Sequence, residues 1–369
     1  MSNRTIIGLD ASRAATSQRT GTEGYAYFLI KALLEVGQGV DFRLYVNQKS
    51  VEGLFPAGAN IQIVYLPAGR LWTHTRLAWE LHRRPPNLFF TPAHVIPLSY
   101  SGRSLATIHD LGYHYFPQAH TRSQVAYLRW STAHNARRSQ TILADSAATK
   151  QDLVRWYGIA PDKIKVIYPG RDPHLQPVTD PRQLADVQQK YGLHPPYLLY
   201  LGTLQPRKNL GRLIEAYAQS GLPHQLVLAG KVGWLAQPIL TQIANLARPI
   251  HLPGFIADED KAALISGATA LLYPSLYEGF GFPIVEGQAC GVPVLAANNS
   301  SLPEVAGEGA LLVGAEDTAA LAQALRQIVL DDGLRQRLIP AGYANLQRFS
   351  WKKAAEQVLQ TINGLLERG

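Results

Sequence analysis

The sequence predicts an α/β protein with two doubly wound, Rossmann-like parallel-sheet domains. Short apolar runs alternate with longer segments of helical periodicity along almost the whole chain, a pattern typical of parallel strands covered by helices on both faces. The alternation forms two series, and the densest proline cluster of the chain separates them at residues 169–196. The length of 369 residues also favours two domains, since one domain usually holds about 100–200 residues.

The first series defines an N-terminal domain at residues 1–172. Its apolar runs predict strands at TIIGLD (5–10), FRLYV (42–46), IQIVYL (61–66), NLFFT (87–91), SLATIH (104–109), TILAD (141–145) and IKVIYP (164–169). Helical periodicity between these runs predicts helices at 25–35 and 123–136.

The second series defines a C-terminal domain at residues 173–348, which begins with a linker at 173–196. Prolines fix φ and remove backbone donors, so the linker is expected to hold at most a short helix near 182–191. The predicted strands are YLLYLG (197–202), QLVLAG (225–230), PIHLPG (249–254), ALLYPS (270–275) and PVLAA (293–297). The predicted helices are 210–218, 235–246, 259–266, 283–289 and 319–329. A final helix at 349–369 is expected to pack back toward the N-terminal domain.

Composition excludes several classes of protein. Hydrophobic residues make up 46% of the chain, which is enough for a large core and excludes a wholly disordered chain. The single cysteine, Cys290, cannot form an internal disulfide or a thiolate zinc site. The start of the chain lacks the apolar stretch of a signal peptide, and no run approaches the ~18 apolar residues of a membrane span. We therefore expect a soluble, cytoplasmic protein of the size of an enzyme.

All the excess positive charge lies in the N-terminal half. Residues 1–172 hold 20 Lys and Arg against 11 Asp and Glu, whereas residues 173–369 hold 15 against 16. Basic and aromatic side chains mix in RLWTHTRLAWELHRR (70–84) and again at 122–138. Such helices can lie on the anionic inner face of a membrane, and they are also typical of two-sided helices in α/β domains, so both interpretations stay open. No nucleic-acid-binding motif accompanies the charge, so nucleic acid is not an expected partner.

The stretch PSLYEGFGFPIVEGQACGVPVLA (274–296) gives the strongest indication of chemistry. It follows a predicted strand and leads into a helix expected to begin at Pro283, whose fixed φ suits the first helical position. Glu278 lies in the loop, and Glu286 lies inside the helix, where a carboxylate can accept hydrogen bonds from a ribose or sugar diol. The loop between them is predicted to expose amides that favour a phosphate, those of Gly279, Phe280 and Gly281. By spacing alone, a glycine turn with two surface glutamates explains the stretch equally well.

Residues 278–286, E-G-F-G-F-P-I-V-E, resemble the E-x7-E signature of glycosyltransferase family 4 (group 1), whose members are retaining enzymes of the GT-B fold. Other stretches resemble the family in the same order: TGTEGYAYFLIKAL (20–33), TIHDLGYHYFP (107–117), YLGTLQPRKNLGRLIEAY (200–217), NSSLPEVAG (299–307) and FSWKKAAEQVL (349–359). The resemblance covers nearly the whole chain. It implies an acceptor-binding N-terminal domain and a donor-binding C-terminal domain that face a central cleft.

The resemblance implies roles for residues that follow the strand at 197–202. Lys208 would bind the diphosphate of the donor as a point charge and so take part in catalysis, with Arg207 beside it. Many members carry a basic residue just after the glycine of this strand, whereas this chain has Thr203 at that donor-binding position. The diphosphate is therefore expected to rest on the two cations and on the amides of 279–281.

The resemblance also places Glu286 at the ribose of the donor and Glu278, as a catalytic residue, near the transferred sugar. In the N-terminal domain, Gly21 and Gly24 would let a loop approach the diphosphate and the reacting centre. His109 ends a predicted strand, and by resemblance it hydrogen-bonds the donor sugar and stabilises charge in the transition state. It completes the expected catalytic set without having to act as a general base.

The expected reaction is transfer of a hexose from a nucleotide-diphosphate sugar to a hydroxyl of a saccharide or lipid-linked acceptor. Catalysis needs cations and amides aimed at the departing phosphates, and the resemblance implies retention of anomeric configuration. Similar sequences favour GDP-mannose as donor, although the residues themselves indicate neither base nor sugar. Two alternatives stay open: a sugar-nucleotide epimerase of similar architecture and a non-catalytic nucleotide-sugar-binding protein.

No metal ion or other cofactor is expected. The D-x-D sequence at Asp258–Asp260 matches the metal-binding signature of the other large glycosyltransferase fold. It directly precedes a predicted helix, so an N-cap and acidic residues in the first helical turn explain it better.

Overall fold

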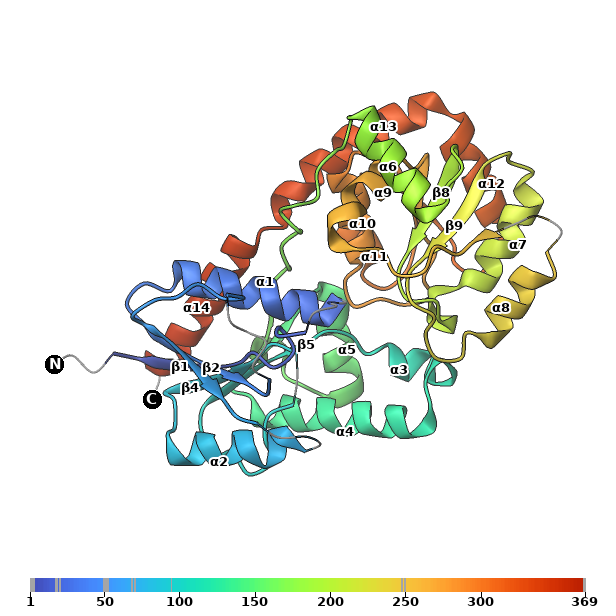
Figure 1. The fold of residues 1–369 in the computed structure, drawn as a ribbon. Coiled ribbons are helices and arrows are strands. Elements are labelled where there is room, and N and C mark those ends of the chain that lie inside the picture. Colours follow the sequence, from blue (N-terminus) through green and yellow to red (C-terminus); the bar gives the residue numbers. More distant parts are fainter. Residues whose placement is uncertain are drawn as a thin grey trace. The chain divides into compact units, whose positions relative to one another are not determined.

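The computed structural model describes residues 4–16, 19, 21–48, 53–67, 69, 71–93, 95–246, 248 and 250–367. Thr20, Arg70 and Pro249, which belong to predicted motifs or elements, lie outside the described residues. The chain forms two compact units (Figure 1), one of Met1–Leu111, Ala126–Gly170 and Phe349–Gly369 and the other of Gly112–Val125 and Arg171–Arg348. Each unit contains one parallel sheet, and the predicted α/β class with two doubly wound sheets is confirmed.

The sheet of the first unit has seven strands in the order β3-β2-β1-β4-β5-β6-β7. They are β1 (Ile6–Asp10), β2 (Asp41–Val46), β3 (Ile61–Tyr65), β4 (Leu88–Thr91), β5 (Ser104–Ile108), β6 (Thr141–Ala144) and β7 (Ile164–Val166). The central strands β4, β5 and β6 are buried along their whole length, as their continuous apolar sequences require. The strand order reverses between β1 and β4, which gives this unit a topological switch point.

Helices and short 3-10 turns cover the sheet of the first unit. They are α1 (Gly21–Val36), η1 (Trp72–His74), α2 (Arg76–Arg83), α4 (Arg122–Arg138, which belongs to this unit from Ala126 onward), α5 (Ala147–Tyr157), η3 (Pro161–Lys163) and α14 (Trp351–Glu367). Helix α1 begins at Gly21, so Gly21 and Gly24 form its first turn and do not lie in a loop as predicted. Glu23 in that turn complements the helix dipole, and the apolar run from Tyr25 onward extends the helix back over both glycines.

The last helix, α14, belongs to the first unit, where it lies beside α1 (Figure 1). The ring of Trp351 stacks on Phe28 with centroids 5.6 Å apart and meets Tyr25 edge-on at 5.7 Å. A Cβ atom at Gly170 would lie 2.2 Å from the backbone nitrogen of Trp351, so the contact requires glycine there. This contact fixes the point at which the chain re-enters the first unit.

The sheet of the second unit has six strands in the order β10-β9-β8-β11-β12-β13. They are β8 (Tyr197–Leu201), β9 (Gln225–Ala229), β10 (Ile250–His251), β11 (Ala270–Tyr273), β12 (Val294–Ala297) and β13 (Ala310–Val313), of which the last was not predicted. The order reverses between β8 and β11, which forms the switch point of this unit.

The second unit has more helices than the sequence predicts. They are α3 (Gly112–Tyr115), α6 (Pro181–Tyr191), α7 (Leu210–Ser220), α8 (Gln237–Ala244), α9 (Lys261–Ser266), α10 (Phe282–Ala289), α11 (Leu302–Ala306), α12 (Thr318–Leu330) and α13 (Asp332–Asn345). The 3-10 turns are η2 (Pro117–Ala119), η4 (Pro206–Lys208), η5 (Asp258–Asp260) and η6 (Leu346–Arg348). Within the described ranges of both units, no helix combines the length and the hydrophobicity that crossing a membrane requires.

Residues 112–125 were predicted in the N-terminal domain, but they group with the second unit. Tyr115 stacks on Tyr277 with ring centroids 5.1 Å apart. The indole Nε1 of Trp234 donates to the carbonyl oxygen of Ala119 at 2.5 Å. These aromatic contacts with distant parts of the sequence attach the segment to the second unit. A single domain boundary at residue 172 cannot show this, because it assigns every earlier residue to the N-terminal domain.

Candidate active site

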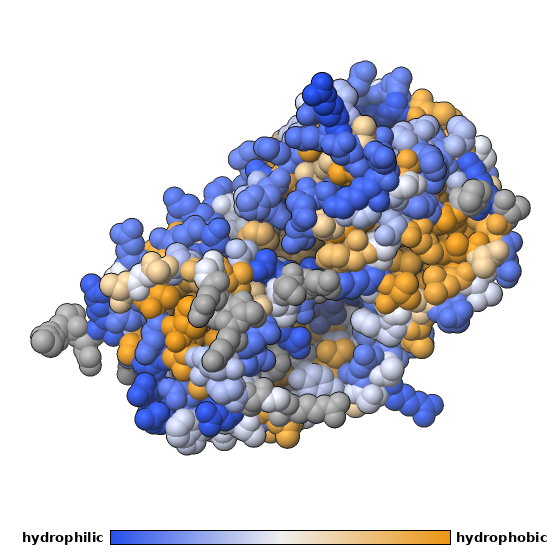
Figure 2. Space-filling view, viewed as in Figure 1, coloured by the Kyte–Doolittle hydropathy of each residue, from blue (hydrophilic) through white to orange (hydrophobic). Residues whose placement is uncertain are grey.

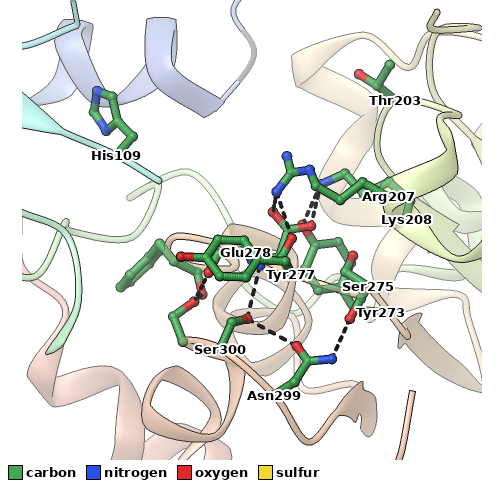
Figure 3. A network of polar contacts seen from close by, with 12 residues as sticks. His109, Thr203, Arg207, Lys208, Tyr273, Ser275, Tyr277, Glu278, Asn299 and Ser300 are labelled. Carbon is green, nitrogen blue, oxygen red and sulfur yellow. Dashed lines mark hydrogen bonds and ion pairs between the residues drawn. The ribbon is translucent and has the colours of Figure 1, made fainter. Parts of the chain in front are cut away.

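The second unit brings three predicted site residues together at its switch point. Arg207 and Lys208 lie in η4 after β8, and Glu278 lies in the loop after β11, the strand next to β8. Because β8 and β11 are parallel, their carboxyl ends meet at the same edge of the sheet. The two basic side chains therefore point at the carboxylate from a neighbouring loop (Figure 3).

Arg207, Lys208 and Glu278 form a buried cluster of charges, here called the charge triad. Lys208 Nζ lies 2.6 Å from Glu278 Oε1 and donates to the Tyr273 hydroxyl at 3.0 Å (Figure 3). Arg207 Nη1 donates to Glu278 Oε2 at 3.2 Å and to the carbonyl oxygen of Tyr277 at 2.6 Å. Glu278 is 7% exposed and Lys208 is 8% exposed, so solvent screens these charges little.

The two cations keep Glu278 ionised. Burial would raise the pKa of Glu278, but the charges of Arg207 and Lys208, with the hydrogen bonds to the carboxylate, lower it to about 2. Burial raises the pKa of the neighbouring Tyr200 and Tyr273 hydroxyls well above their ordinary value, so both stay neutral. The triad therefore carries one net positive charge around neutral pH, which suits an anionic ligand.

The loop that carries Glu278 is held by two serines from the segment after β12. The backbone N–H of Glu278 donates to Ser300 Oγ at 3.0 Å. Ser301 Oγ donates to the carbonyl oxygens of Glu278, at 2.9 Å, and Phe280, at 2.7 Å. In the sequence, NSSLPEVAG (299–307) carries only the family resemblance, and neither serine has a predicted role. The pair of hydroxyls after an apolar strand is the feature that points to loop-binding donors.

The amides of the loop do not lie at an exposed helix start as predicted. The structure buries Gly279, Phe280 and Gly281, because Ser301 holds the loop inward and Phe280 packs against Phe282 with ring centroids 5.0 Å apart. Helix α10 begins at Phe282, one residue earlier than expected. Gly281 precedes it with a φ of 117°, a conformation that favours glycine.

Glu286 lies in α10 and belongs to a second ion pair. Lys261 Nζ, from α9, donates to Glu286 Oε1 at 2.5 Å. Burial would lower the pKa of Lys261, but the charge of Glu286 and the hydrogen bond to it raise the pKa above its ordinary value. Lys261 is not among the predicted site residues, since the periodicity of one helix does not show which helix lies beside it.

Thr203 lies in the same loop as the two cations, just after the end of β8 (Figure 3). Its carbonyl oxygen accepts a hydrogen bond from the Tyr200 hydroxyl at 3.0 Å. The side chain of Thr203 carries no charge, so the positive charge of this loop comes from Arg207 and Lys208.

Exposed apolar side chains follow β9 and β10, the strands next in order after β8. They are Val232, Trp234, Leu235, Leu252 and Phe255. Lys231 Nζ lies 4.8 Å from the ring centroid of Phe255, so the two loops meet. Figure 2 shows apolar side chains on the surface of this unit over α7 and α8. An exposed apolar surface at the ligand-binding edge of a sheet suits a planar ring.

The D-x-D sequence forms η5, directly before α9. Asp260 stands at the N-cap position of α9, but its side chain does not form the predicted cap. Its carboxylate accepts instead from Lys190 Nζ and from the Tyr191 hydroxyl of α6, both at 2.6 Å. Both donors bind the same carboxylate oxygen, Oδ2, in place of a backbone N–H of α9. Among the residues that the structure describes, no three His, Cys, Asp or Glu side chains gather as a metal-ligand set.

The first unit has its own polar cluster at the carboxyl edge of its sheet. His109 follows β5, with Nδ1 2.6 Å from Asp145 Oδ2 and Nε2 2.9 Å from the carbonyl oxygen of Pro92. Tyr25 of α1 meets the imidazole edge-on, with ring centroids 4.8 Å apart. His109 is a predicted site residue and Asp145 is not, although Asp145 is likewise the polar residue that ends an apolar strand.

Comparison with known proteins defines the family. The model for Glycosyltransferase Family 4 matches residues 19–175, and the model for Glycosyl transferases group 1 matches residues 184–345. An O-antigen chain mannosyltransferase B of Escherichia coli is 30% identical over 320 residues, which cover 85% of this chain and 84% of that protein. The chain belongs to glycosyltransferase family 4 (group 1) and is a glycosyltransferase, as its motifs predict.

Other comparisons extend this result. The serotype-specific mannosyltransferase WbdA of Escherichia coli is 29% identical over 243 residues, and these cover 62% of this chain but only 29% of that longer protein. A sucrose-phosphate synthase from Thermosynechococcus elongatus has a TM-score of 0.79 at 23% identity, over 99% of this chain and 100% of that chain. Anabaena HepE in complex with UDP-glucose has a TM-score of 0.76 at 19% identity, over 98% and 100%. The predicted GT-B fold is confirmed.

Proposed function

We propose that the protein transfers a hexosyl group from a nucleotide-diphosphate sugar to a hydroxyl of a saccharide or lipid-linked acceptor. The observation that carries this proposal is the charge triad at the switch point of the second unit. Its net positive charge suits a departing diphosphate, whose negative charge grows as the glycosidic bond breaks. The mannosyltransferase relative and the HepE complex with UDP-glucose support a sugar-nucleotide donor.

The triad would act on the leaving group. Lys208 offers a compact point charge, and Arg207, whose Nη1 donates to Glu278 and Tyr277, adds the delocalised charge of its guanidinium. Glu278 holds both cations in place before the donor arrives, so they need little reorganisation during the reaction. The exposed apolar loops after β9 and β10 offer a surface for stacking a nucleobase, which favours a nucleotide over a bare phosphate.

Acceptor-dependent release of the nucleoside diphosphate tests this function. With a short mannose-terminated oligosaccharide as acceptor, the protein should release GDP from GDP-mannose faster than it does without acceptor. An epimerase would convert the donor without any acceptor, and a binding protein would release nothing. Either result would contradict hexosyl transfer.

As donor we propose GDP-mannose, because the two relatives described above are both mannosyltransferases. A thermal-shift panel of GDP, UDP, dTDP and ADP at equal concentration tests the base. GDP should raise the melting temperature most, since a ligand that binds only the folded state stabilises it. A shift with UDP and none with GDP would contradict this choice of donor.

We further propose retention of anomeric configuration and catalysis without a metal ion. The acceptor oxygen would bond to the anomeric carbon from the face of the departing phosphate as the bond from that carbon to the phosphate oxygen breaks. The hydroxyl proton would pass to the departing phosphate oxygen, and the two cations of the triad would stabilise the leaving diphosphate. The one-bond carbon–hydrogen coupling of the new linkage, measured by NMR, reports the configuration. An α-linked donor should give an α-linked product, and a β-linked product would contradict retention.

We also propose that the first unit contacts an anionic membrane through α2 and α4. Trp79 of α2 is 52% exposed, and Tyr127 and Trp130 of α4 are 50% and 41% exposed. Arg83 lies 5.2 Å from the ring centroid of Trp79. Trp130 meets the ring of His74, next to α2, at 6.2 Å, so both helices belong to one surface. Exposed aromatic rings beside arginines suit the interface of an anionic bilayer.

Sedimentation with vesicles tests the membrane contact. The protein should bind vesicles that contain phosphatidylglycerol and should bind pure phosphatidylcholine far less, since the basic residues need anionic headgroups. Trp79→Ser combined with Trp130→Ser should weaken this binding without changing turnover of a water-soluble acceptor. Equal binding to both kinds of vesicle, or no effect of the substitutions, would contradict the contact.

A further inference from the structure

Three neighbouring strands of the first unit are each followed by a residue that belongs to one hydrogen-bonded group. Strands β4, β5 and β6 are adjacent in the sheet, and Pro92, His109 and Asp145 directly follow them. His109 lies between the other two, with Nδ1 2.6 Å from Asp145 Oδ2 and Nε2 2.9 Å from the carbonyl oxygen of Pro92. The strand register itself therefore brings the three groups together.

The partners of His109 decide where its protons lie. The carbonyl oxygen of Pro92 can only accept, so Nε2 carries a hydrogen. Toward Asp145, an imidazole nitrogen (ordinary pKa about 6.5) is a stronger base than a carboxylate (about 3.9), so the shared proton lies on Nδ1. A ring with hydrogens on both nitrogens is an imidazolium, and it has no lone pair with which to take up a further proton.

In the described part of the chain, the Asp145 side chain has His109 as its one hydrogen-bond partner. The side chain is 4% exposed, Oδ2 bonds to His109, and Oδ1 is buried without a donor. Burying a carboxylate is costly unless a cation or several donors compensate for the lost water. A charged His109 offsets this cost, whereas a neutral ring would leave the carboxylate poorly compensated.

The other groups around His109 hold the ring without competing for its protons. Tyr25 of α1 meets the ring edge-on, and its hydroxyl lies 3.2 Å from Thr107 Oγ1. Burial raises the pKa of Tyr25 well above its ordinary value, so Tyr25 stays neutral. Asp110, the next residue, adds a second negative charge nearby. Thr149 Oγ1 donates to the carbonyl oxygen of His109 at 3.1 Å and so fixes the main chain.

These surroundings favour the charged ring. Burial alone would lower the pKa of His109. The charge of Asp145, the hydrogen bonds to Asp145 and Pro92, and the charge of Asp110 together outweigh burial and raise the pKa above its ordinary value. The imidazolium form therefore extends to higher pH than in a free histidine.

We propose that Asp145 is a positioning residue that holds His109 as an imidazolium with both N–H groups engaged, so that His109 takes part in the reaction in its charged form and not as a general base. This inference rests on the proposed function and on the predicted place of His109 at the donor, and it assigns the charge state of that group. Because Nε2–H donates to the carbonyl oxygen of Pro92 and Nδ1–H to Asp145, the ring has no lone pair with which to take up a proton during the reaction.

Substitution of Asp145 by Asn tests this assignment, because Asn keeps the shape and removes the charge. Nitrogen NMR of protein labelled with ¹⁵N-histidine should show both ring nitrogens of His109 protonated near neutral pH in the wild type. In Asp145→Asn the titration midpoint of His109 should fall by about one pH unit or more, as expected when an adjacent opposite charge is lost. His109→Gln identifies the signal by its loss, and Asp162→Asn, an exposed acid of the same unit, should leave the midpoint unchanged.

The pH profile of turnover separates positioning from mere structural support. In the wild type, kcat should fall as pH rises through the His109 midpoint, and in Asp145→Asn this fall should move to lower pH with little change in the donor KM. Lowering the pH should restore much of the activity of the variant, whereas a structural defect would lower kcat by the same factor at every pH. Such a uniform loss, or an unshifted NMR midpoint, would overturn the proposal.

The NMR titration of the wild-type protein tests the charge state of His109 even if Asp145→Asn fails to fold. A His109 ring that is neutral near pH 7, with one nitrogen unprotonated, would overturn the proposal. Failure of the proposed function would look different, as a lack of acceptor-dependent GDP release by the wild type, and the NMR titration does not depend on that assay.

Discussion

Glu278 and Glu286 belong to separate ion pairs, and their substitutions are expected to change the kinetics differently. Glu286 is expected to contact the ribose, which does not change during the reaction, so Glu286→Gln should chiefly raise the donor KM. Glu278 holds the two cations that are proposed to face the leaving group, so Glu278→Gln should chiefly lower kcat. Steady-state kinetics of both variants, with circular dichroism as the folding control, measures the difference. The same pattern in both, or changes below about twofold in both constants, would contradict these roles.

The ionised state of Glu278 also predicts how stability depends on pH. Its pKa of about 2 lies below the ordinary value of 4.5, so its ion pairs stabilise the fold fully above the ordinary value and stop doing so as pH falls toward 2. The difference corresponds to roughly 3 kcal/mol. Glu278→Gln should therefore lower the free energy of unfolding at pH 7 by up to about that amount and flatten its acid dependence. Urea denaturation over a pH series measures both effects, and a variant as stable as the wild type at pH 7 would refute them.

The sequence indicated single site residues better than their partners. Arg207, Lys208 and Glu278 could be predicted because each follows an apolar strand and lies in a stretch that resembles the family. Asp145 and Lys261 could not, because their contacts join elements that are distant in the sequence. Strand order and helix neighbours decide such contacts, and neither follows from local periodicity.

Helix α14 is fixed to the first unit by a contact that leaves no room for a side chain at Gly170. Gly170→Ala would place a Cβ 2.2 Å from the nitrogen of Trp351, so we expect a loss of about 1–3 kcal/mol in the free energy of unfolding. Gly364→Ala, inside α14, is the matched control. Its Cβ would meet none of the described atoms within 4 Å, and a gain of about 0.5–1 kcal/mol is expected from helix propensity.

Chemical denaturation of the two glycine variants measures both changes. Gly170→Ala at wild-type stability would show that α14 does not depend on this contact. Destabilisation of similar size by Gly364→Ala would show that the loss of stability in Gly170→Ala does not depend on the contact with Trp351.

Long, strongly periodic elements were predicted, and short or glycine-rich ones were not. β13 was missed because the four apolar residues at 310–313 fit a strand or a buried helix equally well. The start of α1 was predicted too late because Gly21 and Gly24 are typical of loops, whereas the helix, whose buried residues begin at Tyr25, continues back through both glycines. For β13, tertiary packing decides between the local alternatives.

Across the whole molecule, the two sheets could be predicted from the alternation of apolar strands and helices, and the grouping of residues 112–125 could not. That segment joins the second unit through Tyr115 and Trp234, whose partners are Tyr277 and Ala119. Aromatic side chains pack well against many surfaces, so their presence in a loop does not show which surface they cover.

Catalysis by the cations of the protein itself predicts that activity survives chelation. Turnover of GDP-mannose should be the same in excess EDTA as in buffer, because the proposed function assigns stabilisation of the leaving diphosphate to Arg207 and Lys208. Added Mg²⁺ or Mn²⁺ is the matched comparison. Loss of activity on chelation that either ion restores would contradict this proposal. It would instead support metal binding at Asp258–Asp260.

Calorimetric titration of Lys208→Ala with GDP and with guanosine tests most directly whether the charge triad binds the diphosphate. Lys208 is expected to contact phosphate alone, so the variant should bind GDP about 10–100-fold more weakly, as for a lost charge-assisted hydrogen bond of roughly 1.5–3 kcal/mol, and should bind guanosine as the wild type does. Lys190→Ala removes an ammonium that pairs with Asp260 in the same unit and should leave both affinities unchanged. Equal weakening of GDP and guanosine by Lys208→Ala, or weakening of neither, would contradict the assignment of the triad to the diphosphate.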